Sequence, residues 1–190
     1  MTRTQYYTAT SLDGFIADAD NSLSWLFEVE GDPEAHRTEW ESFIGSVGAM
    51  AMGATTYRWI LDHERLLERP EQWQEMYADR PSWVFTHRDL PVIPGADIRY
   101  CDGGVAPVHA AMVEAAAGRN VWLIGGGDLV GQFDDAGLLD EIRLGMMPVF
   151  LGSGAPLLPR RITSKRLTLR TVDGRGPQVS LVYDVAKPSG

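Results

Sequence analysis

The sequence predicts an α/β fold in which a mostly parallel, twisted β-sheet has helices on both faces and ends in a C-terminal antiparallel hairpin. Strand-like and helix-like patterns alternate along the first two thirds of the chain. The last third changes to period-two alternation on both sides of a Gly/Pro-rich turn. No internal repeat or change in composition marks a linker, so the 190 residues are expected to form one domain, 1–190.

The N-terminal quarter is expected to supply two short strands, a loop and a helix. Residues 6–10 are strand-like, and the turn pair Asp13-Gly14 leads into a second apolar piece at 15–17, followed by an irregular loop. Asp32-Pro33 is typical of a helix start, because Asp caps free amides and Pro suits the first helical position. Apolar residues then repeat at helical spacing and predict a face packed on the sheet: Trp40, Phe43, Ile44 and Val47.

The middle of the chain repeats this strand-then-helix pattern. An apolar run ends at Gly53 and passes into a helical stretch, and an alanine-rich helix further on is closed by Gly118. Strands are predicted at 49–52, 82–85 and 98–100, and helices at 57–67 and 108–117.

The most informative stretch is the apolar run 121–124, which stops at three glycines, 125–127, before a helix closed near Gly137. Residues without Cβ let the backbone turn sharply and approach a ligand closely. The first amides of the helix carry partial positive charge, so the junction is suited to holding a phosphate. The alternative is a plain strand-to-helix turn that binds nothing.

The last third is expected to complete the sheet. A strand at 142–144 is followed by a Gly/Pro loop at 151–156. Residues 167–169 and 179–183 then alternate with period two on either side of the turn 173–177, which predicts an antiparallel hairpin.

Three predicted strand ends carry residues suited to phosphate. If their strands are parallel, these ends meet along one crevice beyond the carboxyl edge of the sheet, where ligands of such folds bind. Two of them open helices and would each offer amides to half of a pyrophosphate, which favours a dinucleotide. The third offers a hydroxyl and a guanidinium for an adenosine 2'-phosphate, which favours NADPH over NADH. The ends are Gly53-Ala54-Thr55-Thr56, Thr86-His87-Arg88 and Gly125-Gly126-Gly127.

Simpler interpretations of the same residues stay open. Thr55 is equally suited to capping its own helix. Arg88 and Asp89 would form a solvated ion pair worth under about 1 kcal/mol, and His87 would be a surface residue. Asp128 would repel a nearby phosphate unless its side chain turns away to cap the helix.

Composition limits the classes of function. The net charge of −9 argues against a nucleic-acid surface, which needs a basic stripe. No stretch approaches the roughly 20 apolar residues of a membrane helix, and the N-terminus lacks the apolar middle of a signal peptide, so a cytoplasmic location is expected. The single cysteine, Cys101, has no second thiol for a disulfide or a metal and no identifiable activating group. We expect it to be structural and predict no metal site.

Several motifs, taken in order, resemble the dihydrofolate reductase-like superfamily, and within it the C-terminal reductase domain of the bifunctional riboflavin-pathway deaminase-reductase. The matching pieces lie in the same order over nearly the whole chain. They are Ser11-Leu12-Asp13-Gly14-Phe15-Ile16-Ala17, Gly53-Ala54-Thr55-Thr56-Tyr57, Ile124-Gly125-Gly126-Gly127, Leu139-Asp140-Glu141-Ile142, Pro148-Val149-Phe150-Leu151-Gly152 and Gly154-Ala155-Pro156-Leu157.

The resemblance implies a three-layer fold, a homodimer, and NADPH-dependent reduction of a pterin- or pyrimidine-like ring. It also implies a cis peptide between Gly125 and Gly126. Carried over by position, the resemblance assigns the nicotinamide to Ala9, Ile16 and Ala17, the phosphates to Gly53, Ala54, Thr55 and Thr56, the adenosine end to Thr86, His87 and Arg88, and the pyrophosphate to Gly126, Gly127, Asp128 and Leu129.

Two departures from the family pattern are visible. Ala54 stands where the family often has a basic residue, so a 2'-phosphate contact depends on His87 or Arg88. No acid aligns cleanly with the carboxylate that protonates the pterin in dihydrofolate reductases. Glu39 is the nearest candidate for that catalytic role, with Glu34 and Asp32 behind it. Trp25 is the candidate for a wall of the substrate pocket. Alternatively, Glu39 is a solvent-facing charge and Trp25 belongs to the core.

The leading hypothesis is therefore an NADPH-dependent reductase that resembles 5-amino-6-(5-phosphoribosylamino)uracil reductase, acting on a small heterocycle. The chain has none of the cysteine pairs of a zinc deaminase, so a free-standing reductase of another ring is equally compatible. The alternatives are a non-catalytic nucleotide-binding or sensing homodimer, and a structural dimer formed through the C-terminal hairpin with Leu181 and Tyr183.

Overall fold

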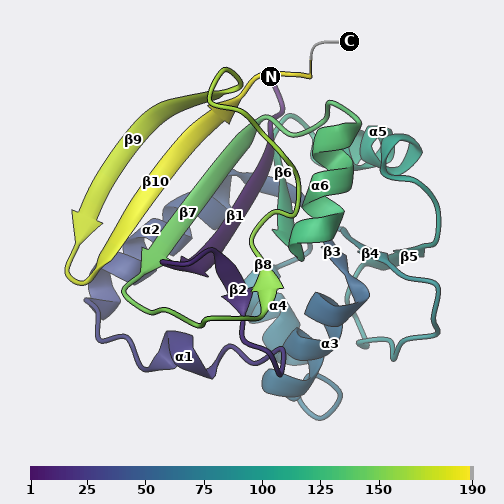
Figure 1. Ribbon diagram of the computed structural model, residues 1–190. Coiled ribbons are helices and arrows are strands. Elements are labelled where there is room, and N and C mark those ends of the chain that lie inside the picture. The colour runs from purple at the N-terminus through teal and green to yellow at the C-terminus, as the bar shows by residue number, and fades with distance from the viewer. Residues whose placement is uncertain (189–190) are drawn as a thin grey trace.

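The computed structural model contains an eight-stranded sheet in the order β5-β4-β3-β6-β1-β7-β10-β9 (Figure 1). It describes residues 1–188, apart from the side chains of Ala35 and Arg175. The strands of this sheet are β1 Thr4–Ser11, β3 Val47–Gly53, β4 Ser82–Phe85, β5 Ile98–Cys101, β6 Asn120–Gly125, β7 Glu141–Met147, β9 Leu167–Arg175 and β10 Gln178–Val185. A separate two-stranded sheet pairs β2 Phe15–Ala17 with β8 Ala155–Pro156.

The direction of the strands agrees with the predicted topology. Neighbouring pairs from β5 through β7 run parallel, and β10 pairs antiparallel with both β7 and β9. The carboxyl ends of β1, β3, β4, β6 and β7 therefore lie along one edge of the sheet. That edge is the place where the predicted crevice has to be sought.

Helices cover both faces of the sheet, and alternation along β3 shows why. Ala49 and Ala51 are buried in a core with the helices α5 and α6, whereas Met50 and Met52 are buried on the opposite face with α2, α3 and α4. A strand buried on both faces has few polar positions, which explains its continuous apolar run. The helices are α1 Ser24–Phe27, α2 Pro33–Ser46, α3 Ala54–His63, α4 Glu71–Tyr77, α5 Val105–Ala115 and α6 Gly127–Asp135.

Element boundaries differ from the sequence-based expectation at several places. The start of α2 is confirmed, because the Asp32 carboxylate accepts a hydrogen bond from the Glu34 amide at 3.0 Å. The helix α3 stops at His63 and not at residue 67, since Arg65 adopts a left-handed conformation with φ of 52°. The helix α5 begins at Val105, before the expected residue 108. The short helices α1 and α4 were not predicted.

The hairpin closes more tightly than expected. Its strands continue through most of the predicted turn 173–177, so that β9 ends at Arg175 and β10 begins at Gln178. Gly176 and Pro177 alone form the connection, and Gly176 has a positive φ of 58°, which a residue without Cβ adopts readily.

A carboxylate in the first turn ties down a distant segment. Asp13 accepts hydrogen bonds from the Ser11 hydroxyl at 2.6 Å and from the amides of Leu151 and Gly152 at 3.1 and 2.7 Å. These bonds, the Ser11 bond foremost, lower the pKa of Asp13. Gly154 lies so close that a Cβ there would be 2.0 Å from the Ala17 carbonyl oxygen. The segment 148–157 is thereby held against β2, beside the carboxyl edge of the sheet.

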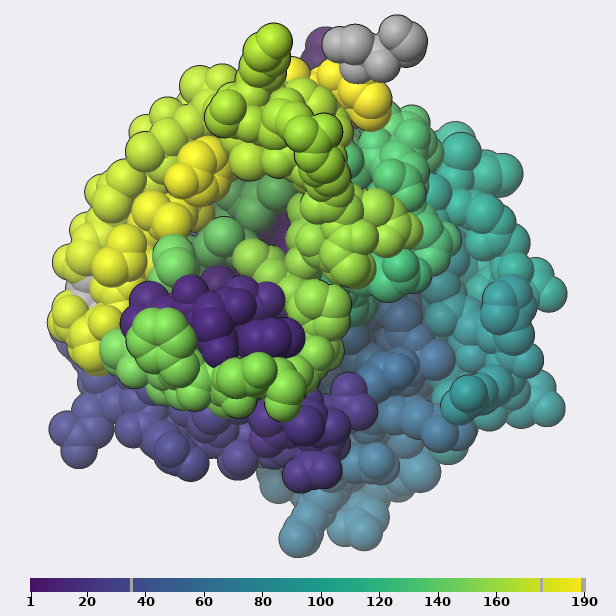
Figure 2. Space-filling model, in the orientation of Figure 1, coloured from purple at the N-terminus to yellow at the C-terminus, as the bar shows by residue number. Residues whose placement is uncertain are grey.

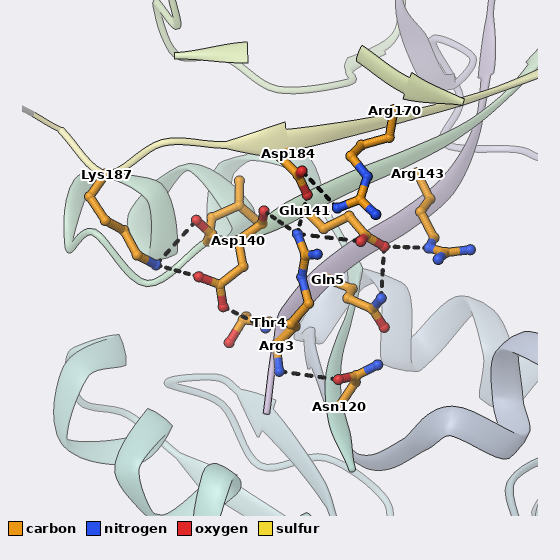
Figure 3. Close-up of polar contacts among 11 residues, drawn as sticks. Arg3, Thr4, Gln5, Asn120, Asp140, Glu141, Arg143, Arg170, Asp184 and Lys187 are labelled. Carbon is orange, nitrogen blue, oxygen red and sulfur yellow. Dashed lines mark hydrogen bonds and ion pairs between the residues drawn. The ribbon is translucent and has the colours of Figure 1, made fainter. Parts of the chain in front are cut away.

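The opposite edge of the sheet, which we call the amino edge, carries an ionic network (Figure 3). At its centre Glu141, buried on β7, accepts a hydrogen bond from Gln5 at 2.7 Å and pairs with Arg3 and Arg143. Arg3 also pairs with Asp184. The remaining contacts join Asp140 to the Thr4 amide (2.8 Å) and to Lys187 (2.6 Å), Asp184 to Arg170 (2.9 Å), and the Arg3 amide to Asn120 (3.1 Å).

Within residues 1–188, no helix is both long enough and apolar enough to cross a membrane.

Candidate functional site

A cavity of about 850 Å³ lies along the carboxyl edge of the sheet, and all three predicted junctions contribute to its walls. Their strands β4, β3 and β6 are neighbours, with Gly53 in register with Phe85 and Met52 in register with Gly125. A Cβ on Gly53 would lie 3.9 Å from the Gly125 carbonyl oxygen. The convergence of separate strand ends predicted from the sequence is therefore present in the structure.

Two of these junctions are helix N-termini without a side-chain cap. Gly53 precedes α3 and Gly126 precedes α6, and neither N-cap position makes a side-chain hydrogen bond. The free first-turn amides of two helices consequently stand at the wall of one cavity. This overturns the alternative in which Thr55 caps α3, because the helix begins at Ala54 and Thr55 lies inside its first turn, where it lines the cavity with Thr56.

Asp128 keeps its negative charge near this wall, but a cation compensates it. Its carboxylate accepts hydrogen bonds from Arg160 and Gln132, each at 3.1 Å. It does not cap α6, which was one of the two alternatives left open by the sequence, since the N-cap is Gly126. Arg160 also pairs with Asp135 at 2.8 Å, and these hydrogen bonds, that with Asp135 foremost, raise the pKa of its guanidinium. Asp128 and Asp135 therefore share one cation, Arg160.

The third junction lies at one end of the cavity and opens no helix, as expected. Thr86 and His87 line the main cavity. Arg88 does not, and instead lines an adjoining hollow of about 540 Å³. The Thr86 hydroxyl accepts a hydrogen bond from the Arg88 amide at 3.0 Å and lies 3.1 Å from its carbonyl oxygen. The backbone of this loop is thereby fixed, and Arg88 stands beside the cavity.

Cys101 lines the same end of the cavity. Its thiol donates to the Val84 carbonyl oxygen at 3.6 Å. Burial, with a smaller contribution from the charge of Asp102, raises the pKa of the Cys101 thiol to about 11. The thiol is protonated near neutral pH, which agrees with the structural role expected for it.

The expected nicotinamide residues lie at the middle of the cavity. Ala9, Ile16 and Ala17 all line it. A Cβ on Gly126 would lie 3.9 Å from the Ile16 side chain, so this group borders the glycine junction directly. The peptide bond between Gly125 and Gly126 is cis, as the resemblance implied.

At the far end, away from the third junction, the cavity has aromatic and polar walls. Gly145 on β7 pairs with Ala9 on β1 and with Ser180 on β10. Ser180 at this end of the cavity is therefore two strands away from Ala9. His36 Nε2 and Gln178 Oε1 are 2.7 Å apart and join α2 to β10. We define the far end by Tyr7, His36, Trp40, Trp122, Gln178 and Ser180.

Both predicted catalytic residues lie behind the cavity wall. Trp25 is 4% exposed and belongs to the core, whereas its neighbours Leu23, the N-cap of α1, and Leu26 line the cavity. Glu39 is half-buried and does not line the cavity in the part of the chain that the structure describes. Its carboxylate lies 3.5 Å from the hydroxyl of Ser180, which does line it.

The pair His36 and Gln178 was missed. His36 and Trp40 stand four positions apart on α2 and share the face toward the cavity. That spacing was visible in the sequence and could have identified His36. Nothing local marks Gln178, because its position depends on where the tight hairpin turn ends.

The order of strands, the helices on both faces and the carboxyl-edge cavity define a dihydrofolate reductase-like fold. Within this class the chain belongs to the family of the RibD C-terminal domain, whose family model matches residues 4–181. The expected family and fold are confirmed.

Similar chains and solved structures were also found. The chain is 31% identical over 187 residues to the uncharacterized protein YwjB of Bacillus subtilis (strain 168), a match that covers 95% of this chain and 97% of that protein. Among solved structures, a Shewanella sp. PV-4 protein named for riboflavin biosynthesis has a TM-score of 0.77 at 24% identity, with 98% and 100% of the two chains covered.

A larger relative shows the same fold as part of a longer chain. It is the diaminohydroxyphosphoribosylaminopyrimidine deaminase/5-amino-6-(5-phosphoribosylamino)uracil reductase of Thermotoga maritima, with a TM-score of 0.64 and 15% identity. The match covers 97% of this chain and 57% of that one, so the present chain spans little more than half of the bifunctional protein.

Proposed function

We propose that this protein is an NADPH-dependent reductase of a pterin- or pyrimidine-like ring. The observation that carries the proposal is the meeting of two uncapped helix N-termini, Gly53 and Gly126, at the wall of one large cavity. Membership of the RibD C-terminal domain family and the reductase name of the Thermotoga maritima relative support it.

The residues present fit a dinucleotide. The amides that follow Gly53 and Gly126 would hold the pyrophosphate, with the hydroxyls of Thr55 and Thr56 as further donors. The cradle is formed by backbone that lacks Cβ atoms on the facing glycines, which leaves room for the phosphate oxygens. Arg88 in the adjoining hollow would contact a 2'-phosphate on the adenosine.

The chain would contribute position and shelter. Bound NADPH supplies a hydride to the ring. Ala9, Ile16 and Ala17 are small or apolar, and they would pack on the nicotinamide and exclude water from the place where the two rings meet. The segment 148–157, tied to Asp13, would hold this wall in place.

The test begins with binding. Ligand at about 100 times its dissociation constant should add roughly 2.7 kcal/mol to the free energy of unfolding, which a thermal-shift titration detects. We expect a shift with NADPH and a smaller one with NADH. Absence of a shift with both nucleotides rejects the proposal. Turnover is then followed as loss of nicotinamide absorbance with pteridines and aminouracils.

A second candidate is a non-catalytic nucleotide-binding or sensing protein with the same cavity. It is favoured by the position of Glu39, which lies behind Ser180 and not at the cavity wall. Saturable NADPH binding without absorbance loss for any ring tested would support this alternative.

We also propose that the protein is a homodimer that pairs through the C-terminal hairpin. No helix covers the front face of β7, β10 and β9 in Figure 1, and Figure 2 shows a hollow beside the yellow hairpin strand. Leu169 and Val172 are 49% and 58% exposed on β9. Light scattering should give twice the mass of the chain, and Val172→Asp should give the monomer. A monomeric parent protein would reject the proposal.

A further inference from the structure

The inference concerns Arg160, which lies beside α6, and it rests on the nucleotide site proposed at the start of that helix. The chain that follows β8 runs along α6 (Figure 1). It approaches closely, because a Cβ on Gly127 would lie only 2.4 Å from the Leu157 carbonyl oxygen. One turn further along, a Cβ on Gly131 would lie 2.8 Å from Cγ of Arg160. The Arg160 side chain therefore lies directly against the helix at Gly131.

Gly131 has a packing role that explains its place inside a helix. Glycine is less favourable than alanine in a helix interior, because it loses more backbone entropy on folding. A Cβ at this position would also lie 2.9 Å from Cζ and from Nε of Arg160. The bare backbone of Gly131 thus lets the guanidinium of Arg160 approach the surface of α6.

Two carboxylates of α6 and one carbonyl group fix this guanidinium. Nη1 of Arg160 donates to Asp128 at 3.1 Å, and Nε donates to Asp135 at 2.8 Å. Nη1 also donates to the Pro159 carbonyl oxygen at 2.9 Å. Asp128 belongs to the first turn of α6 and lines the cavity, whereas Asp135 is the last residue of the helix, about 10 Å further along its axis. Of the two carboxylates, Asp128 is therefore the one next to the cavity.

The position of Asp128 is unfavourable for an anion in the cavity. Asp128 stands two positions after the N-cap Gly126, and the amides that follow Gly126 are those proposed to hold the pyrophosphate. A carboxylate and a phosphate repel each other, and the repulsion grows where protein replaces water. A guanidinium paired with the carboxylate offsets that repulsion.

We propose that Arg160 is a positioning residue for the nucleotide and acts through Asp128. By pairing with this carboxylate, Arg160 offsets the negative charge beside the N-terminus of α6, so that the free amides there accept a pyrophosphate. The cation comes from the chain after β8 and not from either of the two helices that form the cradle. Gly131 makes this possible by leaving space for the arginine side chain.

Calorimetric titration of NADPH into the parent protein and its variants tests the role of Arg160. Arg160→Met removes the cation and keeps much of the side-chain volume, and we expect about tenfold weaker binding at low ionic strength. Raising the salt concentration should narrow the difference from the parent, because salt screens the repulsion. Arg160→Lys keeps the charge and should lose less affinity than Arg160→Met. Urea denaturation of each variant verifies that the titrated protein is folded.

Two second substitutions supply a matched comparison, because each removes one carboxylate partner of Arg160. Arg160→Met with Asp128→Asn should restore NADPH affinity to within about twofold of the parent, since the unpaired charge next to the cavity is gone. Arg160→Met with Asp135→Asn removes an equal charge about 10 Å further along the helix, and should restore much less. As a single variant, Asp128→Asn should bind NADPH at least as tightly as the parent protein does.

The outcomes distinguish this proposal from the proposed function. If the parent protein binds neither NADPH nor NADH, the reductase function is rejected and the role of Arg160 with it. If the parent protein binds NADPH and Arg160→Met binds it equally well, the role of Arg160 alone is wrong. That role is also wrong if the loss does not depend on salt, or if Asp135→Asn restores binding as well as Asp128→Asn does. Weaker binding by the single variant Asp128→Asn would likewise overturn it, because the carboxylate would then contact the nucleotide itself.

Discussion

The two edges of the sheet differ in whether their polar groups are paired within the protein. At the amino edge, buried Glu141 is surrounded by Arg3, Arg143 and the amide N–H of Gln5, so its charge is paired within the protein (Figure 3). At the carboxyl edge, the N-termini of α3 and α6 are left uncapped beside a cavity of about 850 Å³. The same parallel strands carry both edges.

From this difference we infer that the amino edge stabilises the fold and that the carboxyl edge binds a ligand. Paired charges at the amino edge join β1, β7, β9 and β10, which come from distant parts of the chain. Unpaired amides at the carboxyl edge stabilise nothing inside the protein, but they offer partial positive charge to an anion. A substitution at one edge should therefore change the free energy of unfolding, and a substitution at the other should change affinity.

The largest effect is expected from Glu141→Ala. It removes the shared partner of two arginines and a buried amide, and the loss of one member of a buried charge cluster costs about 3 kcal/mol. Urea denaturation measures the change, and NADPH affinity should stay within twofold. Asp97→Ala is the matched control, because its pair with Arg99 is 46% exposed on both sides and is expected to contribute less than about 1 kcal/mol. Equal losses in the two variants would contradict the division between the edges.

The reverse experiment is Gly53→Ala. The added Cβ would meet the Gly125 carbonyl oxygen and the Gly126 nitrogen at 3.9 Å, an ordinary contact, so the fold should tolerate it. It would occupy the space proposed for the pyrophosphate, and we expect NADPH to bind about tenfold more weakly, a change of about 1.4 kcal/mol. Calorimetric titration measures this.

Gly104→Ala provides the control for that variant. Gly104 is likewise an extended N-cap glycine, in this case of α5, and a Cβ there would meet nothing within 4 Å. It does not line the cavity in the described part of the chain. A similar loss of NADPH affinity in both variants would show that the effect comes from the helix start and not from the cradle.

The sequence predicted the carboxyl edge better than the far end of the cavity, for a physical reason. Glycines after an apolar run are a local signal, because the backbone conformation that they permit is set within a few residues. Gly53 and Gly126 could therefore be placed at a shared crevice once the strands were taken as parallel.

The far end depends on tertiary arrangement. His36 faces Gln178 across 142 positions in the chain, and this meeting requires both the packing of α2 on the sheet and the tight turn at Gly176. Glu39 and Trp25 were chosen as polar or aromatic residues in the expected region, but helical rotation decides which side chain faces the cavity. Residues three or four positions apart share a face, whereas a shift of one or two positions turns a side chain from the cavity wall toward the core.

A smaller effect is expected from Arg88→Ala, which tests the adenosine end. Because Arg88 lines the adjoining hollow and is exposed, loss of its contact with a 2'-phosphate should cost about 1 kcal/mol. NADPH should lose about fivefold in affinity, and NADH, which lacks that phosphate, should be unaffected. Titration of both nucleotides against the variant measures the two values. Equal loss of affinity for NADPH and NADH would mean that Arg88 maintains the shape of the loop and does not contact the 2'-phosphate.

The smallest effect is expected at Cys101, whose thiol should react only slowly near neutral pH. Burial disfavours the thiolate and raises the thiol pKa to about 11, so the reactive fraction falls about tenfold for each pH unit below that value. Alkylation by iodoacetamide should be slow at pH 7 and should accelerate steadily up to pH 10, as mass spectrometry of timed samples would show. Because Cys101 lines the cavity, saturating NADPH should slow the reaction further at every pH. Rapid alkylation at pH 7 would mean that this end of the cavity activates the thiol. The carboxyl edge would then differ from the amino edge in chemical reactivity as well as in ligand binding.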